Sequence, residues 1–245
     1  MLKARDLATR ALPAILFSVC LAVLCTMGLV SGAIAQNYLP LTIGNIWHYE
    51  SLAGYSEDRV VTGTNTIRGT TTYVIDYQNS TSNTGLENYW TTGSEGDVLL
   101  WGWWLEFDGF GILWDPAILY LDAPLFLGKT WNVTTTGYEL PDTTFFASFD
   151  ITFQVVGEGM ISVPAGDFFS FAITYTVSAA APGGDARALY GARIAAAFSG
   201  GPTDWYSDGI GQVQYDTDDL YQLVSFNVPT ATQPTTWGGI KGLYR

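Results

Sequence analysis

The chain has 245 residues, of which 48% are hydrophobic and 15% aromatic, and it carries 10 Lys and Arg against 23 Asp and Glu, a formal net charge of -13. Intrinsic disorder is excluded, because so aromatic a chain can bury enough apolar surface to offset its ordering entropy. The acidic balance argues against nucleic-acid binding, since a phosphate backbone needs a basic surface. With one His and two Cys, we expect no metal site and no cofactor.

Residues 1–35 have the layout of a secretory signal peptide. Three basic residues and one acid open the chain, an uncharged apolar run follows from Ala11 to Val30, and the small residues of Ser31–Ala35 come last. The alternative is an uncleaved anchor, since about 20 apolar residues can span a bilayer. Both cysteines, Cys20 and Cys25, lie in this segment. We expect an exported protein, periplasmic or extracellular, with no integral membrane segment after cleavage.

Residues 36–228 show a hydrophobic period of two, which is typical of antiparallel strands with one face on a core. The alternation is clearest over 145–155, with Phe146 as the exception, and over 169–177 and 73–77. Between the first two runs, Val163–Gly166 predicts a turn in which Pro164 fixes φ and Gly166 is free to adopt a positive φ. A change of parity at Leu223–Val224 predicts a β-bulge. This part of the chain is predicted to be a single all-β domain.

One segment of the β domain and the end of the chain depart from this pattern. The Ala-rich stretch 179–201 is interpreted as an insertion, and the spacing predicts one short helix over 185–198 with Asp185 as its N-cap. A flexible Ala/Gly loop is the alternative. Residues 229–245 contain two prolines and are expected to form an irregular tail.

Four short motifs follow one another in the β domain. They are Tyr38–Tyr49 with Gly44 and Trp47, Asp122–Trp131 with Gly128 and Trp131, Val163–Phe168 with Pro164 and Gly166, and Trp205–Val213 with Trp205, Gly209 and Gly211. In this order they resemble the motifs of a group of secreted bacterial β proteins, the DUF3108-like or TapB-like group. The resemblance implies a single strongly curved antiparallel sheet, an open half-barrel similar to periplasmic lipoprotein carriers, and offers no catalytic residues. The motif residues themselves indicate structural roles, as strand entries, tight bends and buried aromatic anchors.

A cluster of aromatic residues is the feature with functional content. Trp101, Trp103, Trp104 and Trp114 fall within 14 residues, with Asp108 among them. The alternation places Trp101 and Trp103 on one face of a strand and Trp104 on the other. Exposed Trp rings beside acidic groups are a way to bind sugars or apolar ligands. We predict a non-catalytic protein that binds an unknown ligand, apolar or glycan, or a protein partner on this concave face; the alternative is a purely structural aromatic core.

The candidates for catalysis are weak. His48 is expected to be a surface or hydrogen-bonded histidine rather than a base. The acidic run Asp216–Asp219 lacks the loop glycine and closing Glu of an EF-hand, so a solvated turn is expected. The alternative function is a secreted hydrolase that acts on polysaccharide through acidic residues such as Asp108 or Asp115. A third alternative, a membrane β-barrel, is disfavoured by the C-terminal Arg245 and the lack of a lipid-facing belt.

Overall fold

The computed structural model describes residues 36–80, 85–180, 203–216 and 219–228. The chain divides into two units, Met1–Ala35 and Gln36–Arg245, and all described residues belong to the second. The predicted helix over 185–198, the signal peptide and the irregular tail lie outside the described residues.

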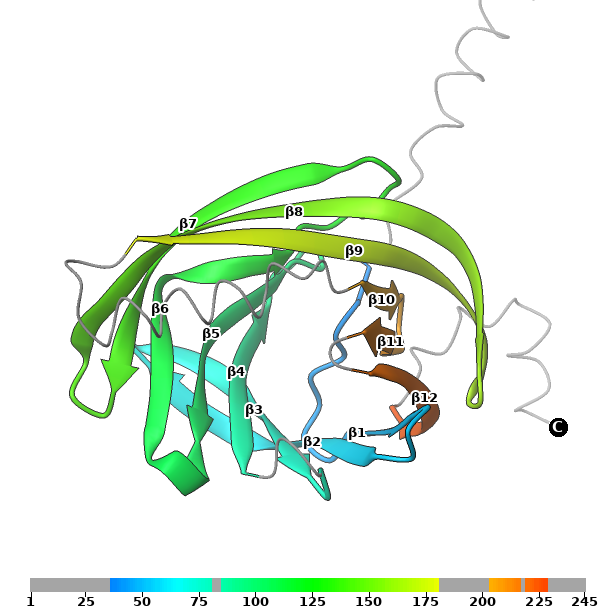
Figure 1. Ribbon diagram of the computed structural model, residues 1–245, viewed down its shortest axis with the longest axis horizontal. Coiled ribbons are helices and arrows are strands. Elements are labelled where there is room, and N and C mark those ends of the chain that lie inside the picture. Colours follow the sequence, from blue (N-terminus) through cyan, green and yellow to red (C-terminus); the bar gives the residue numbers. More distant parts are fainter. Residues whose placement is uncertain (1–35, 81–84, 181–202, 217–218, 229–245) are drawn as a thin grey trace, which may run out of the picture. The chain divides into compact units, whose positions relative to one another are not determined.

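Twelve antiparallel strands form a closed barrel in which every strand pairs with its neighbours along the chain (Figure 1). The strands are β1 (Ile46–Ser51), β2 (Ser56–Ile67), β3 (Thr70–Gln78), β4 (Leu86–Thr92), β5 (Val98–Leu105), β6 (Phe110–Leu121), β7 (Thr130–Leu140), β8 (Thr144–Val163), β9 (Gly166–Ala180), β10 (Asp204–Ser207), β11 (Gly211–Asp216) and β12 (Leu220–Asn227). A single turn of 3-10 helix, η1 (Glu106–Asp108), joins β5 to β6. Among the described residues, no helix is long and apolar enough to cross a membrane.

The predicted open half-barrel is wrong, because the first and last strands pair with each other. The ladder between β1 and β12 runs from Ile46 opposite Asn227 to Ser51 opposite Tyr221. A sheet that closes on itself leaves no unpaired edge for another chain to join. The predicted short helix over 185–198 falls outside the described ranges, in which η1 is the helical element. The all-β prediction is confirmed.

The strands that the alternation predicted most clearly are present. Residues 145–155, 169–177 and 73–77 lie in β8, β9 and β3, and Val163 pairs with Gly166 across the predicted turn. The predicted bulge near Val224 is confirmed by a register shift, since His48 pairs with Ser225 and Tyr49 with Leu223.

Phe146 breaks the alternation because of a second β-bulge. The ladder between β7 and β8 shifts register there, with Gly137 opposite Ala147 and Tyr138 opposite Phe145. The bulge turns Phe146 into the core and leaves Phe145 exposed.

The end of the barrel where β1 begins is crossed by the segment Gln36–Asn45. The amide of Leu125 donates to Gln36 Oε1 at 3.3 Å, and the amide of Gly209 donates to the Asn37 carbonyl at 2.9 Å. Tyr38, between these contacts, is fully buried. The segment therefore spans from the β6–β7 loop to the β10–β11 turn and covers this end of the core.

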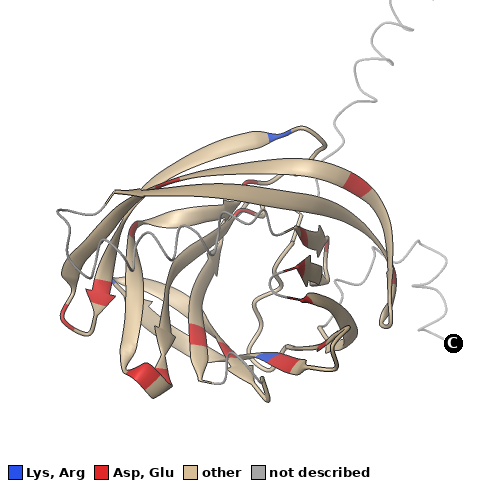
Figure 2. Cartoon of the chain, in the orientation of Figure 1, with Lys and Arg blue, Asp and Glu red and all other residues tan. Residues whose placement is uncertain are grey.

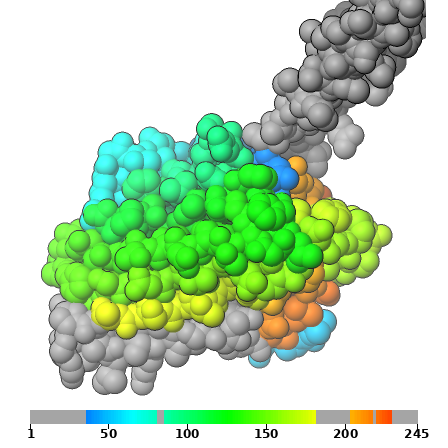
Figure 3. Space-filling view, turned by 90° about the horizontal axis from the view of Figure 1, so that it is seen from above, coloured from blue at the N-terminus to red at the C-terminus, as the bar shows by residue number. Residues whose placement is uncertain are grey.

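The β8–β9 hairpin extends beyond the barrel wall at the same end. β7 pairs with β8 only as far as Gln154, so the rest of β8 projects beyond β7 (Figure 3, lime). The tip bends onto β12, where the Ala165 amide donates to the Leu223 carbonyl at 3.0 Å and the rings of Phe168 and Phe226 are 5.9 Å apart. The hairpin tip thus packs against the strand that closes the barrel.

Candidate functional site

The structure divides the predicted tryptophan cluster between the two faces of the barrel wall. Trp114 is buried in the interior core and Trp103 packs against that core, whereas Trp101 and Trp104 pack on the outer face. The prediction that Trp101 and Trp103 share a face is wrong, because the β4–β5 ladder shifts register between Tyr89 and Trp90 and places Trp101 in a bulge.

A hairpin covers the outer pair of tryptophans. The outer cluster consists of Ile67 and Val74 from the β2–β3 hairpin, Tyr89 of β4 and Leu113 of β6, with Trp101, Trp104 and Leu140 packed against it. Arg68, at the tip of this hairpin, forms an ion pair with Asp115 of β6. The outer tryptophans therefore serve as a packing surface for the hairpin.

The inner pair lines an apolar cavity of about 50 Å³ inside the barrel. Its wall includes Trp103, Trp114, Phe149, Phe153, Tyr120 and Tyr175. The Trp114 ring meets the Phe149 ring edge to face at 5.1 Å. A buried water occupies about 10–15 Å³ on this measure, so the cavity has room for roughly four groups of that size.

The indole N–H of Trp114 is a buried donor without a hydrogen-bond partner among the described residues, but it does not face the cavity, whose surface is apolar throughout. Leaving a buried donor unsatisfied costs about 1–3 kcal/mol. The unsatisfied donor therefore offers no contact to a molecule inside the cavity.

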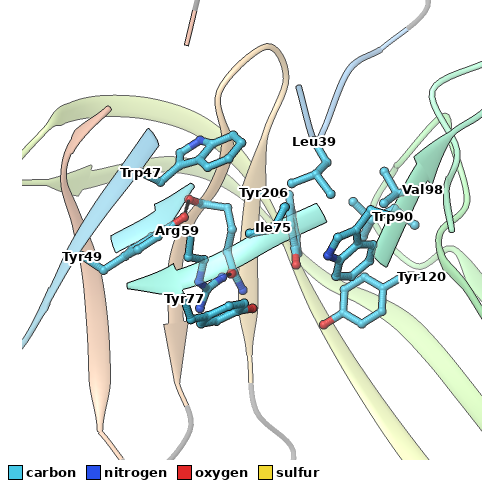
Figure 4. A pocket seen from close by; sticks show the side chains of 12 residues that line it. Leu39, Trp47, Tyr49, Arg59, Ile75, Tyr77, Trp90, Val98, Tyr120 and Tyr206 are labelled. Carbon is cyan, nitrogen blue, oxygen red and sulfur yellow. Dashed lines mark hydrogen bonds between the residues drawn. The ribbon is translucent and has the colours of Figure 1, made fainter. Parts of the chain in front are cut away.

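A second interior cavity, of about 30 Å³, has a mainly apolar wall with a few polar groups (Figure 4), and is called the polar cavity below. Arg59 of β2 lies in it, with its guanidinium 4.8 Å from the ring centres of Tyr49 and Tyr77 and 4.3 Å from that of Tyr215. The Arg59 Nε donates to Glu57 Oε1 at 2.7 Å. This buried cation is thus held by one carboxylate and three aromatic faces.

A second buried carboxyl, Asp204 at the start of β10, is hydrogen-bonded to a tyrosine that lines both cavities. The Tyr120 hydroxyl donates to Asp204 Oδ2 at 2.8 Å, and the Tyr120 ring lines the polar and the apolar cavity alike. Burial raises the pKa of Asp204 to about 6, against the hydrogen bond from Tyr120 and the attraction of Arg59. The carboxyl of Asp204 is therefore mostly ionised at neutral pH.

The remaining sequence candidates lie outside the barrel interior. Asp108 is exposed in η1, and Asp115 is exposed on β6 with Arg68 as its partner. Asp108 precedes β6, and the six residues from Phe110 to Asp115 alone span about 16 Å of strand, well beyond the separation of the two carboxyls in glycosidases. His48 is on the outer face, where its Nδ1 lies 2.5 Å from Asp58 Oδ1. Among the described residues, no group of three or more His, Cys, Asp or Glu is arranged to hold a metal.

Residues of the first and the last of the four motifs contact each other near the seam of the barrel, where β1 pairs with β12. The Trp47 Nε1–H donates to the Ile210 carbonyl at 2.7 Å, and a Cβ on Gly211 would lie 3.1 Å from that nitrogen. Gly209 and Gly211 both have positive φ. Trp205 lies beside them on β10 and is half-buried.

The residues of the two central motifs, Asp122–Trp131 and Val163–Phe168, also lie in turns and strand entries. Gly44 and Gly128 have positive φ, and their amides donate to carbonyls of β2 and β8. Trp131 stacks on Phe153 at 5.1 Å. Pro164 and Gly166 form the β8–β9 turn.

Sequence reasoning missed Glu57, Arg59 and Asp204. β2 carries charged residues on both faces, with Asp58 outside between Glu57 and Arg59, so no alternation marks an interior. An inward charge pair in a strand cannot be distinguished from a solvated one until the barrel closes around it.

Comparisons with known proteins are limited to fold. No family model and no curated protein matches the chain, so the resemblance to the DUF3108-like or TapB-like group is not confirmed. Similar solved structures include a candidate lipoprotein from Parabacteroides distasonis, 14% identical with a TM-score of 0.40, which covers 79% of this chain and 99% of its own. Another is a candidate exported protein with a YmcC-like fold from Bacteroides fragilis, 14% identical with a TM-score of 0.45, covering 78% and 99%.

Proposed function

We propose that this chain is an exported, non-catalytic barrel protein that binds a small, mainly apolar ligand in its interior. The observation that carries the proposal is the apolar cavity between Trp103 and Trp114. Apolar cavities of this kind stay dry, and a small apolar molecule that fills one stabilises the folded protein. The signal-like N-terminus supports export.

The chemistry of the wall limits what the ligand can be. The volume of the cavity favours a ligand of about four heavy atoms, such as a short alkyl chain, and its apolar surface favours a ligand without polar groups. A bulky glycan would need far more polar partners than this wall supplies.

The test is to fill the cavity from within. Leu100→Phe adds a ring at a residue that lines the cavity, and we expect it to abolish xenon binding, measured by xenon NMR, in a protein that still unfolds cooperatively. Leu99→Phe is the matched control, because Leu99 precedes Leu100 in the same strand and points to the opposite face. We expect that control to bind xenon as the unaltered protein does.

Two results would contradict the proposal. The first is the absence of xenon binding to the unaltered protein. The second is equal xenon affinity in both variants, which would place any binding outside the Trp103–Trp114 cavity.

A further inference from the structure

Strand β8 overhangs its neighbour β7 and keeps a free edge beyond the barrel wall. The last main-chain hydrogen bonds on the β7 side join Val155 to Gly128 and Lys129 of the β6–β7 loop. Over the residues from Val156 to Ser162, β8 pairs with β9 on one side, and no main-chain hydrogen bond within the described ranges reaches its other side. Closure of the barrel pairs β1 with β12 but leaves this stretch of β8 open (Figure 1).

The free stretch is fixed at both ends and exposes apolar side chains. Val155 holds its start, and beyond its end the Ala165 amide donates to the Leu223 carbonyl of β12 at 3.0 Å. Met160 and Phe169 are opposite each other across the β8–β9 hairpin, and they are 62% and 52% exposed. An unpaired edge beside exposed apolar side chains is a surface to which another strand can add.

The sequence of the stretch offers little resistance to a second strand. A β-bulge lies at its start, between Val155 and Gly157. The stretch from Val156 to Ser162 contains no proline and no lysine, which commonly block strand edges, and Glu158 is its one charged residue. An added Cβ on Gly159 would meet nothing within 4 Å, so another backbone can approach closely at this point.

The stretch is complementary to itself, because Gly159 is its midpoint. Two copies aligned antiparallel about Gly159 pair every position of the stretch, and each contact occurs twice across the twofold axis. In this register Glu158 lies opposite Met160 of the second copy, whereas a register centred on Glu158 would set two carboxylates face to face. The exposed Met160 side chains of the two copies become diagonal neighbours on one face of the joined sheet.

We propose that two copies of this chain form a dimer by pairing their β8 edges antiparallel about Gly159. This inference goes beyond the proposed function, because it concerns the outside of each barrel and not the apolar cavity. A single strand pair of this length is smaller than a standard interface, so the dimer should dissociate on dilution. Acidic positions are spread over strands and loops with few basic ones between them (Figure 2), so the two copies repel each other and added NaCl should tighten the dimer.

Opposite charges at position 160 test the register. Met160→Glu places a carboxylate opposite Glu158 in both symmetry-related pairs, and Met160→Lys places an ammonium group there. Sedimentation equilibrium measures the Kd of the dimer, which we expect to rise for Met160→Glu and to fall for Met160→Lys, each by about two- to thirtyfold.

Leu52→Glu and Leu52→Lys are the matched controls. They make the same changes of charge at a leucine that is 72% exposed in the turn between β1 and β2. Because long-range effects of one exposed charge are screened by salt, both controls should leave the Kd within about twofold of the unaltered protein.

A compensating exchange separates direct pairing from a general effect of charge. Glu158→Lys, added to Met160→Glu, restores opposite charges across the axis in the same register, so the Kd should return to within about threefold of the unaltered protein. Glu158 and Met160 are both exposed, so these variants should fold, and urea unfolding checks that they do.

Three results would overturn the proposal. The first is a protein that stays monomeric up to about 1 mM, the concentration at which even a weak association is populated. The second is a dimer whose Kd does not respond to the charge at position 160, which would place the interface elsewhere. The third is an equal response to the Leu52 variants, which would show that net charge and not strand pairing controls association.

Discussion

A single buried carboxyl gives the barrel a pH-dependent stability. Burial raises the pKa of Asp204 from 3.8 to about 6. Between these values the folded protein holds a proton that the unfolded chain releases, so Asp204 favours folding most below about pH 4. That contribution is lost as the pH rises through about 6, by on the order of 3 kcal/mol in total.

Asp204→Asn should remove this loss, because an amide keeps an acceptor for the Tyr120 hydroxyl without a charge. We expect the free energy of unfolding of the variant, relative to the unaltered protein, to increase by up to about 3 kcal/mol from pH 4 to pH 7. Urea unfolding followed by tryptophan fluorescence at each pH measures the difference. A difference that does not change with pH would show that Asp204 titrates normally.

The backbone conformation and the contact with Trp47 both favour glycine at position 211. It has a φ of 110°, and an added Cβ would press on the Trp47 indole at 3.1 Å. We expect Gly211→Ala to lower the free energy of unfolding by about 1–3 kcal/mol through backbone strain and overpacking.

Gly209→Ala is the matched control for Gly211→Ala. Gly209 has a φ of 75°, but its added Cβ would meet nothing within 4 Å. It should therefore cost only the backbone strain, on the order of 1 kcal/mol. Equal losses for the two variants, measured by urea unfolding, would show that the contact with Trp47 contributes nothing.

At the scale of elements, the β2–β3 hairpin stabilises the barrel from outside without forming part of the site. Ile67→Ala removes buried side chain from the outer cluster. We expect a loss of about 2–4 kcal/mol in the free energy of unfolding and unchanged xenon affinity. Xenon NMR of the folded variant checks this, and a loss of xenon binding would mean that the outer cluster, not the interior, holds the ligand.

The sequence predicts a strand wherever apolar and polar residues alternate. It does not predict which face a side chain occupies where one extra residue, a β-bulge, reverses the alternation. β8 and β9 follow from their period-two pattern, and the parity change at Val224 locates its bulge. The bulge at Trp101 gives no such signal, because tryptophans stand on both sides of it and any register looks equally apolar. The division of the tryptophans between the two faces therefore required the strand pairing.

At the scale of the whole molecule, closure of the barrel is the feature that local patterns do not contain. β1 and β12 come from opposite ends of the β domain, and neither strand specifies its partner by composition. The motif resemblance implied a curved sheet but not the final pairing. Once the sheet closes, inward residues such as Arg59 and Asp204 become an interior site, which is why that site was missed.

Closure has a direct signature in hydrogen exchange. Because β1 is paired on both sides, its amides should exchange as slowly as those of β5, which lies in the middle of the wall. Mass spectrometry of peptides that cover Ile46–Ser51 and Val98–Leu105 compares the two strands. Fast exchange confined to β1 and β12 would mean that the seam is open.

The central claim is that the ligand binds inside the barrel, and the tryptophans on its two faces provide the most direct measurement. The chain has 9 Trp, and incorporation of 5-fluorotryptophan gives each a fluorine resonance that single Trp→Phe variants assign. On addition of xenon, the account predicts shifts of the Trp103 and Trp114 resonances and none of Trp101 and Trp104. Shifts confined to Trp101 and Trp104, or no shift at saturating xenon, would contradict it.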